Sequence, residues 1–292
     1  LGYEALRGAL PATNNTGQSN TAVGDQALWV NTTGGSNTST GANALQANNT
    51  GSNNTANGKG ALQANTTGGS NTAMGANALF SNVANSRSTA LGYGAMYYAD
   101  NRTTGRDGFN TAVGYEALRG SAVAANNTGQ NNTAIGDRAM LNNASGGNNT
   151  AIGLEALRDN ANATANTASG VWALRLNQTG NYNTSNGAFA LQNNKTGNSN
   201  TAIGVDALGS NMAGSNNTAS GTGALQKNTV SDNTATGAAA LTNNTIGTQN
   251  TAIGTNALLA NVTGSLNTAI GYAADAAGPN AATLTNATAI GA

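Results

Sequence analysis

A short word, Asn-Thr-Ala-x-Gly, recurs along the whole chain and constrains its fold more than any other feature. The glycine that closes this word stands at 17 places, from Gly2 to Gly291. Of the 16 intervals between them, 11 are 17 residues long, three are 22, one is 20 and one is 16. One such repeat cannot close a core alone, but copies stacked along an axis can, so the sequence predicts a solenoid.

The repeat has a clear consensus when its positions are numbered from the Asn. Positions 1 to 17 read Asn-Thr-Ala-x-Gly-x-x-Ala-Leu-x-x-Asn-x-Thr-Gly-x-x. Position 2 is Thr in all 16 complete copies, and position 1 is Asn in 14 of them. Position 8 is Ala in every copy from Ala5 to Ala274, and position 9 is Leu or Met in every copy except at Asp275. Every copy therefore has the same packing requirement.

The consensus predicts the path of one coil. Thr and the frequent Ile or Val at position 4 favour a short strand over positions 1 to 4. Gly at position 5 permits a corner with positive φ. Good helix formers follow, as in residues 3–7 and 115–119, and they favour a helical or irregular turn, with a second strand as the alternative. The Asn-x-Thr-Gly segment predicts the turn that leads to the next coil.

The expected fold class is therefore all-β, a β-solenoid (parallel β-roll) of about 17 coils with the 17-residue repeat. Each coil would contain one short strand and one helical or irregular turn. Ala at positions 3 and 8 and Leu at position 9 would fill a thin interior. Asn at positions 1 and 12 would form ladders of side-chain amides, because an amide both donates and accepts hydrogen bonds.

The composition follows from the repeat and excludes several function classes. Ala, Asn, Gly and Thr make up 187 of 292 residues, which would suggest disorder if they were not periodic. Cys and His are absent, which excludes thiolate or imidazole metal sites and Ser-His-Asp or Cys-His catalysis. The net charge is 0, unlike the basic surface of a nucleic-acid binder. No apolar run approaches the roughly 18 residues of a membrane span. We therefore expect no enzyme activity, cofactor, metal, nucleic acid or membrane insertion in this segment.

Position 4 is the informative irregularity of the repeat. It is apolar in ten copies, from Val23 to Ile290, and polar in six: Thr40, Asn57, Ser169, Asn186, Ser220 and Thr236. A lone polar side chain buried inside one coil would be costly. Polar layers on an axis shared between identical chains could satisfy one another. We therefore expect position 4 to face an oligomer axis, with three-fold symmetry as the favoured arrangement.

The longer intervals interrupt an otherwise single repetitive domain over residues 1–292. We expect this domain to be a segment of a longer fibre, with longer loops within 2–24, 92–136 and 271–291. Insertions in solenoids map to loops on one face, which is often the binding face. The candidate recognition loop lies in the second of these ranges and comprises Tyr97, Tyr98, Arg102, Arg106 and Phe109. The alternative is a tolerated surface loop without a ligand.

The repeat resembles those of a known family of fibrous proteins. Thr-Ala-Ile-Gly-x-x-Ala, at 133–139, 150–156 and 201–207, resembles the YadA-like head repeats of trimeric autotransporter adhesins. The full repeat is similar to long repeats of tail-fibre-like proteins of phages and bacteria, whereas the adhesin head repeat is shorter. The resemblance implies a tight homotrimer of parallel β-rolls and a location that is extracellular, on a cell surface or on a virion appendage.

Three functions are compatible with these features. The expected one is a structural component of a fibre or appendage that mediates surface attachment or host recognition, with a cell-surface glycan or protein receptor as partner. The second is an ice-binding solenoid that uses the Thr ladder at position 2, although position 4 makes that face non-uniform. The third is a fibre-borne module that binds or degrades polysaccharide, and degradation would require a cluster of carboxylates in a groove.

Overall fold

The computed structural model describes residues 2–8, 15–123, 126–275 and 281–291. Parts of all three predicted long loops, residues 9–14, 124–125 and 276–280, lie outside the described residues. The chain divides into two compact units, 1–148 and 149–292, and each is described by itself. The expectation of one domain over 1–292 stays a prediction.

Both units consist of three-residue strands that follow one another at the repeat spacing. In unit 1 the strands are β1 (Thr21–Val23), β2 (Thr38–Thr40), β3 (Thr55–Asn57), β4 (Thr72–Met74), β5 (Thr89–Leu91), β6 (Thr111–Val113) and β7 (Thr133–Ile135). In unit 2 they are β8 (Thr150–Ile152), β9 (Thr167–Ser169), β10 (Thr184–Asn186), β11 (Thr201–Ile203), β12 (Thr218–Ser220), β13 (Thr234–Thr236), β14 (Thr251–Ile253), β15 (Thr268–Ile270) and β16 (Thr288–Ile290).

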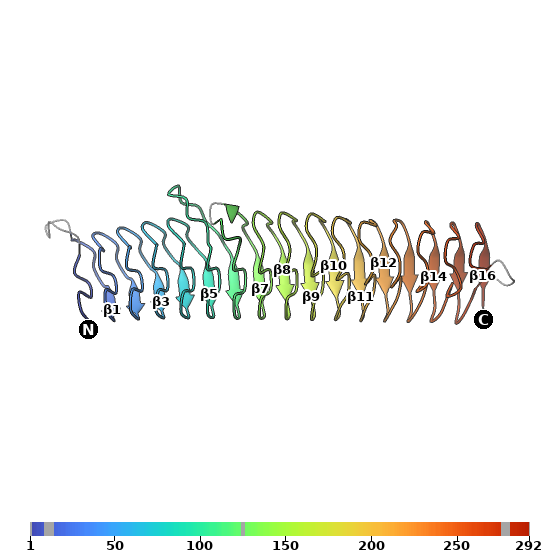
Figure 1. Ribbon diagram of the computed structural model, residues 1–292, viewed down its shortest axis with the longest axis horizontal. Coiled ribbons are helices and arrows are strands. Elements are labelled where there is room, and N and C mark those ends of the chain that lie inside the picture. The colour runs from blue at the N-terminus through green and yellow to red at the C-terminus, as the bar shows by residue number, and fades with distance from the viewer. Residues whose placement is uncertain (1, 9–14, 124–125, 276–280, 292) are drawn as a thin grey trace. The chain divides into compact units, whose positions relative to one another are not determined.

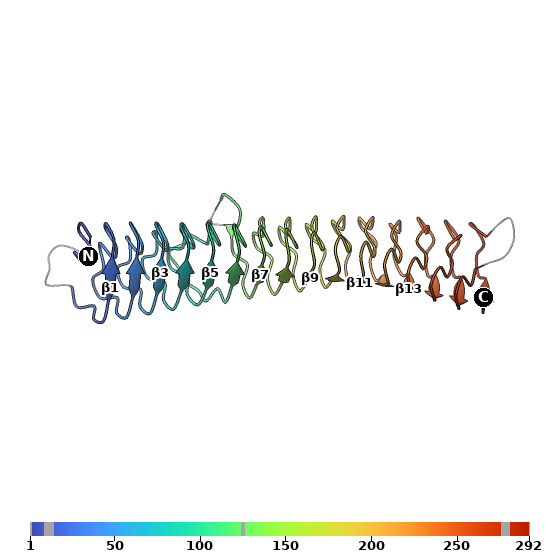
Figure 2. The same cartoon turned by 90° about the horizontal axis from the view of Figure 1, so that it is seen from below.

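Consecutive strands within each unit pair in parallel with the repeat in register. Thr21 lies opposite Thr38 in unit 1, and Thr201 lies opposite Thr218 in unit 2. The strands lie side by side along each unit in two perpendicular views (Figures 1 and 2). The predicted parallel β-solenoid with 17-residue spacing is therefore confirmed.

The number of coils is smaller than predicted. The expectation of about 17 coils came from counting the recurrent glycines, whereas the described residues contain 16 strands and about 15 turns. The difference arises at the first glycine, Gly2, which has no described strand before it. Each turn requires a strand at both of its ends, so 16 strands delimit 15 turns.

Positions 6 to 11 form an irregular turn, and the described residues contain no α-helix. Non-glycine residues at alternate positions 7 and 9 have positive φ, as at Gln26 (52°) and Leu28 (51°). A helix would use backbone hydrogen bonds within one segment. Here the Leu45 amide donates to the Ala61 carbonyl of the next coil at 3.0 Å. The helical form of the predicted turn is therefore wrong, because stacking supplies the backbone partners between coils.

This turn directs the adjacent Ala and Leu of positions 8 and 9 into the interior. Ala27 and Leu28 are both completely buried, as are most of their counterparts. A left-handed backbone costs about 1 kcal/mol for a residue such as Leu. Burial of the Leu side chain stabilises the fold by roughly 1.5–3 kcal/mol and offsets that cost. The predicted interior of Ala at positions 3 and 8 and Leu at position 9 is thus confirmed.

Two predicted amide ladders complete the interior. At position 12, Asn194 Nδ2 donates to Asn177 Oδ1 at 2.8 Å, and Asn194 Oδ1 accepts from Asn211 Nδ2 at 3.0 Å. At position 1, the Asn200 backbone amide donates to Asn183 Oδ1 at 3.0 Å, and Asn200 Nδ2 donates to the Gly214 carbonyl at 2.8 Å. All these Asn side chains are buried. Both ladders are therefore confirmed, and they explain a core with few aromatic residues.

Candidate functional site

The outer face of the strands is the first candidate surface. Successive side chains of a strand point to opposite sides. The residue at position 3 points inward in every coil, and the residues at positions 2 and 4 point outward, as in the exposed–buried–exposed pattern of β3. Each unit therefore presents a Thr column beside a second column formed by position 4. We call this surface the strand face.

The apolar members of position 4 are well exposed in the single chain. Ile152 and Ile203 are each 44% exposed, and Met74 is 41% exposed. They are neighbours over several strands, on β4 to β7 in unit 1 and on β14 to β16 in unit 2. Adjacent exposed aliphatic side chains are characteristic of a surface that contacts another molecule.

The six polar residues of position 4 lie in the same outward columns. The strand face of unit 1 carries Thr40 and Asn57, and that of unit 2 carries Ser169, Asn186, Ser220 and Thr236. They are exposed or half-buried, so none occupies the interior of a coil. This placement is required for residues that face an axis between chains. The axis itself stays a prediction.

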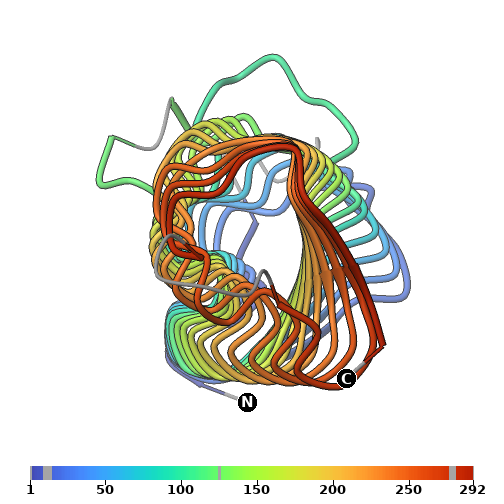
Figure 3. The same ribbon diagram turned by 90° about the vertical axis from the view of Figure 1, so that its right-hand side faces the viewer.

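The second candidate surface is the insertion between β5 and β6. Its loop, teal in Figure 3, projects beyond the outline of the neighbouring coils of unit 1. The five predicted recognition residues divide among three places. Tyr97 and Tyr98 lie on the irregular turn, Arg102 and Arg106 bind Asp100, and the guanidinium of Arg87 lies 5.5 Å from the centroid of the Phe109 ring. The structure therefore does not bring all five together.

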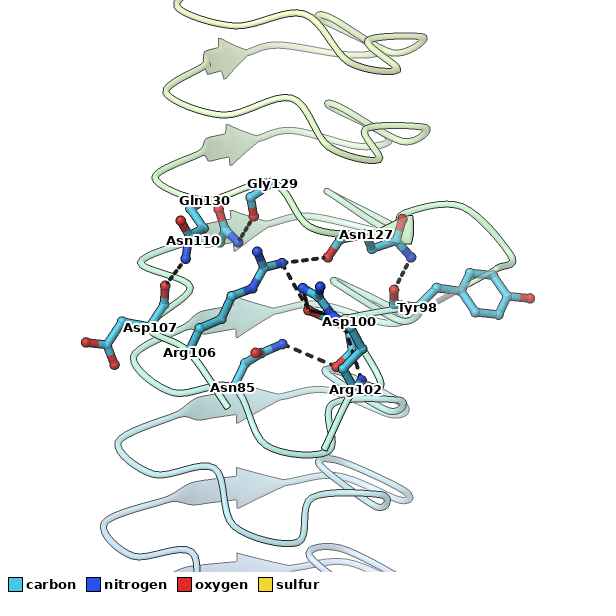
Figure 4. Close-up of polar contacts among 10 residues, drawn as sticks. All are labelled: Asn85, Tyr98, Asp100, Arg102, Arg106, Asp107, Asn110, Asn127, Gly129 and Gln130. Atoms are coloured by element: carbon cyan, nitrogen blue, oxygen red, sulfur yellow. Dashed lines mark hydrogen bonds and ion pairs between the residues drawn. The ribbon is translucent and has the colours of Figure 1, made fainter. Parts of the chain in front are cut away.

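Arg102 and Arg106 both form ion pairs with the buried carboxylate of Asp100, so their charged groups are not free to bind a ligand. Asp100 has only 2% of its side chain exposed. Arg102 Nε donates to both of its oxygens at 2.9 and 3.0 Å, and Arg106 Nη2 lies 3.0 Å from its Oδ2 (Figure 4). Asn85 Nδ2 donates to the Asp100 carbonyl at 3.2 Å. Position 12 of this coil is Ala99, so these polar groups lie where the Asn ladder is interrupted.

Opposing effects act on the Asp100 carboxyl group. Burial by itself raises its pKa. The hydrogen bonds from Arg102 and the positive charges of Arg102 and Arg106 outweigh burial, so the pKa of Asp100 lies below its ordinary value. The carboxylate is therefore ionised at neutral pH and ties the insertion to the solenoid. We assign both arginines this structural role.

Tyr97 and Tyr98 line a surface cleft of about 220 Å³. The Tyr98 ring points away from the Asp100 cluster, as Figure 4 shows. The other lining residues, listed here in chain order, are Asn77, Tyr93, Gly94, Glu116 and Arg119. They come from three consecutive coils and stand at positions 6, 7 and 10 of the repeat, whereas Tyr98 stands at position 11. We call this feature the tyrosine cleft.

The aromatic rings around the cleft are held by one another. Tyr97 stacks on Phe80 with 5.0 Å between ring centroids and meets the Tyr98 ring edge-on at 4.7 Å. Tyr93 stacks on Tyr115 at 5.5 Å. Such pairs contribute about 0.5–1.5 kcal/mol each beyond the area that they bury. The walls of the cleft are therefore ordered without a ligand.

Two charged residues, Glu116 and Arg119, belong to the lining of the tyrosine cleft. Glu116 Oε1 lies 3.5 Å from Arg119 Nε, and its Oε2 lies 3.4 Å from Arg138 Nε. The Arg119 guanidinium lies 5.1 Å from the centroid of the Tyr98 ring. The sequence prediction included only the two tyrosines of this site. Aligning the coils by repeat position would have found the others, because Asn77, Gly94 and Glu116 share position 7.

Within the described part of the chain, no three His, Cys, Asp or Glu side chains gather as they would to hold a metal ion. The same residues include no helix with the length and apolarity needed to cross a membrane. Comparison of the chain with protein families, with curated proteins and with solved structures finds no match.

Proposed function

We propose that this chain is a structural component of an extracellular or virion fibre that mediates surface attachment, and that it assembles as a parallel homotrimer. One observation carries the proposal: the strand face exposes a column of aliphatic side chains, although the described coils already bury Ala and Leu side chains in their own interior. Ile253 and Ile270 lie next to each other in this column, each 42% exposed. Burial in an interface would remove this apolar surface from water and stabilise the assembly.

The mixed composition of the column supports an identical chain as the partner. In a parallel assembly in register, each polar layer such as Asn57 or Asn186 meets its own copy, and each Ile meets Ile. An amide donates and accepts, so Asn side chains around a symmetry axis can bind one another. Cyclic symmetry places the same surface of every chain at the axis.

The proposed role is mechanical and not enzymatic. Asn ladders, register-matched strands and a continuous Ala and Leu interior give rigidity without disulfides, since the chain has no Cys. Identical chains on one fibre would present several copies of any recognition site, which raises the effective affinity of weak contacts.

Replacing two residues of the strand face tests the assembly. We expect the unaltered protein to have three times the 28.6 kDa mass of one chain in light scattering. The double variant Ile253→Asp with Ile270→Asp should be monomeric, because it places unpaired charges in the interface. Its circular dichroism should remain unchanged, since both side chains lie outside the coil.

Ile246→Asp is the matched control, because Ile246 is 60% exposed but lies in the turn after position 12 and not on the strand face. It should keep the trimeric mass. A monomeric unaltered protein, or a double variant that remains trimeric, would contradict the proposed assembly.

Ice binding is the second candidate, favoured by the regularity of the Thr column. Thr lies opposite Thr in every strand pair that is described, with aliphatic side chains on the same face. Under this candidate the protein shows thermal hysteresis, and Thr201→Tyr with Thr218→Tyr reduces it. Under the fibre proposal we expect no hysteresis beyond that of an equal concentration of an unrelated protein.

A further inference from the structure

We propose that the tyrosine cleft is a binding site for a single neutral pyranose ring of a glycan. The inference rests on the proposed function only in that it names what the fibre attaches to. The site is built entirely from described residues of unit 1. It differs from the strand face in position and in chemistry, so the two proposals can fail separately.

The shape of the cleft comes from a missing side chain. At position 7, Asn77 and Glu116 project from the coils on either side, and Gly94 lies between them. A Cβ atom at Gly94 would approach only the Glu116 Cγ, at an ordinary contact distance of 3.7 Å. Tyr93 and Tyr97, at positions 6 and 10 of the same coil, flank the gap. We call the space left by this missing side chain the slot, and Tyr93 and Tyr97 line the same cleft.

The chemistry of the slot fits a sugar ring. Tyrosine offers a large apolar surface together with a hydroxyl group, which suits a ligand with an apolar ring face and polar edges. Asn77 and the Glu116–Arg119 pair, which also line the cleft, supply donors and acceptors for ring hydroxyls. Binding pockets for drug-sized molecules usually measure about 300–1,000 Å³. The volume here, about 220 Å³, suits one ring rather than a longer oligosaccharide.

The charged residues around the cleft disfavour a cationic ligand, and the net charge of the chain does not favour a nucleic acid. Glu116 is paired with Arg119 and Arg138, so its carboxylate offers no unpaired negative charge to a ligand cation. The Arg119 guanidinium also lies over the Tyr98 ring, where a ligand cation would otherwise bind. The whole chain has a net charge of 0, which provides no electrostatic attraction for a nucleic-acid strand. A neutral ligand therefore suits the site best.

Filling the slot tests the proposal. Asn occupies position 7 with positive φ in other coils, at Asn43 (60°) and Asn77 (59°). Gly94→Asn should therefore fold normally and block the gap. Lactose, maltose, cellobiose and N,N′-diacetylchitobiose are the probes, each titrated to millimolar concentration and followed by saturation-transfer NMR and calorimetry. We expect at least one of them to bind the unaltered protein, and Gly94→Asn to weaken its binding about tenfold or more.

Three further variants test the roles of the Tyr97 ring and of the gap at Gly94. Tyr97→Phe keeps the ring and should change affinity less than Tyr97→Ala, which should lower it about tenfold. Gly223→Asn is the matched control, because Gly223 is a position-7 glycine with φ of 65° whose flanking residues, Thr222 and Gln226, are not aromatic. It should leave sugar binding unchanged.

The outcomes separate this inference from the fibre proposal. Absence of binding by all four sugars overturns the sugar site, and so does binding that Gly94→Asn leaves unchanged. Binding of an oligothymidylate or of choline at the cleft, lost in Gly94→Asn while the sugars do not bind, overturns it in favour of another ligand. Trimeric mass in light scattering is measured on the same samples. A trimer without sugar binding retains the fibre and removes only this site.

Discussion

Replacing Gly204 by alanine is expected to destabilise unit 2 by about 3 kcal/mol or more, through backbone strain and overpacking. Gly204 stands at position 5, directly after β11, with φ of 122°. This value lies outside the left-handed region that other residues can enter. An alanine Cβ would also lie 2.7 Å from the carbonyl carbon and oxygen of Gly221 in the next coil. Both atoms belong to the backbone, so the strain cannot be relieved by a side-chain movement.

Urea denaturation followed by circular dichroism measures this effect, and Gly223→Ala provides the comparison. Gly223 has φ of 65°, and its new Cβ would have Thr242 Oγ1 as its neighbour at 3.9 Å. Asp206 and Ala239 occupy the same repeat position in neighbouring coils with φ of 60° and 56°. We expect Gly223→Ala to cost about 1 kcal/mol or less. Equal losses in the two variants would show that position 5 does not need glycine.

The repeat predicted the interior of the coil because few residue types fit at the interior positions. Ala at positions 3 and 8, Leu at position 9 and Asn at positions 1 and 12 recur because a coil of this length leaves room for nothing larger. Even the exceptions obey this limit. Ser39 replaces Ala at position 3, and its buried hydroxyl donates to the Ala44 carbonyl at 2.8 Å.

The turn over positions 6 to 11 could not be predicted in the same way. Segments such as residues 115–119 contain good helix formers, and local propensity favours a helix there. The structure instead has positive φ at Glu116 (52°) and Leu118 (49°). Hydrogen bonds to the neighbouring coils decide between the two forms, and propensities of single residues do not include such bonds.

The candidate site was predicted only in part, for a related reason. Residues of the insertion attract attention because they depart from the repeat, and this pointed to Tyr97, Arg102 and Phe109 together. Stacking places Tyr97 beside residues of other coils, such as Glu116, while Arg102 pairs with Asp100. Proximity across coils depends on repeat position, whereas proximity along the insertion does not ensure contact.

Repeat position therefore separates stability from recognition in this molecule. Positions 1, 3, 5, 8, 9 and 12 form the interior and its corner and vary little. Positions 4, 6, 7 and 10 point outward and vary widely, from Gly94 to Trp172 at position 7. A change at an outward position can create or remove a binding site while leaving the ladders intact. The insertion leaves the parallel pairing of strands β5 and β6 intact.

The largest pH-dependent effect is expected for Asn194→Asp in the position-12 ladder. Asn194 is completely buried, and its Nδ2 donates to Asn177 Oδ1 at 2.8 Å and to the Gly197 carbonyl at 3.0 Å. A carboxyl group can donate only one hydrogen bond there, and only when it is protonated. Burial and the two facing oxygens disfavour the carboxylate, so the pKa of the new side chain rises in the folded state.

The sign of the effect follows from the raised pKa. Below the unfolded pKa of about 3.9, both states are protonated, and the variant loses only about 1 kcal/mol for one missing hydrogen bond. As the pH rises above about 3.9, the unfolded state releases its proton first. The free energy of unfolding then falls by up to about 1.4 kcal/mol per pH unit until the folded pKa is reached. At neutral pH we expect a total loss of about 3–5 kcal/mol, as for an uncompensated buried charge.

Urea denaturation at several values between pH 4 and pH 7 measures this loss against the unaltered protein. Asn256→Asp is the matched control, because Asn256 is only half-buried at position 7, where Asp206 occurs naturally. The control should change the free energy of unfolding by about 0.5 kcal/mol or less at every pH. If the Asn194→Asp deficit did not grow with pH, the carboxylate would be solvated, and position 12 could not be the closed amide ladder that holds the coils together.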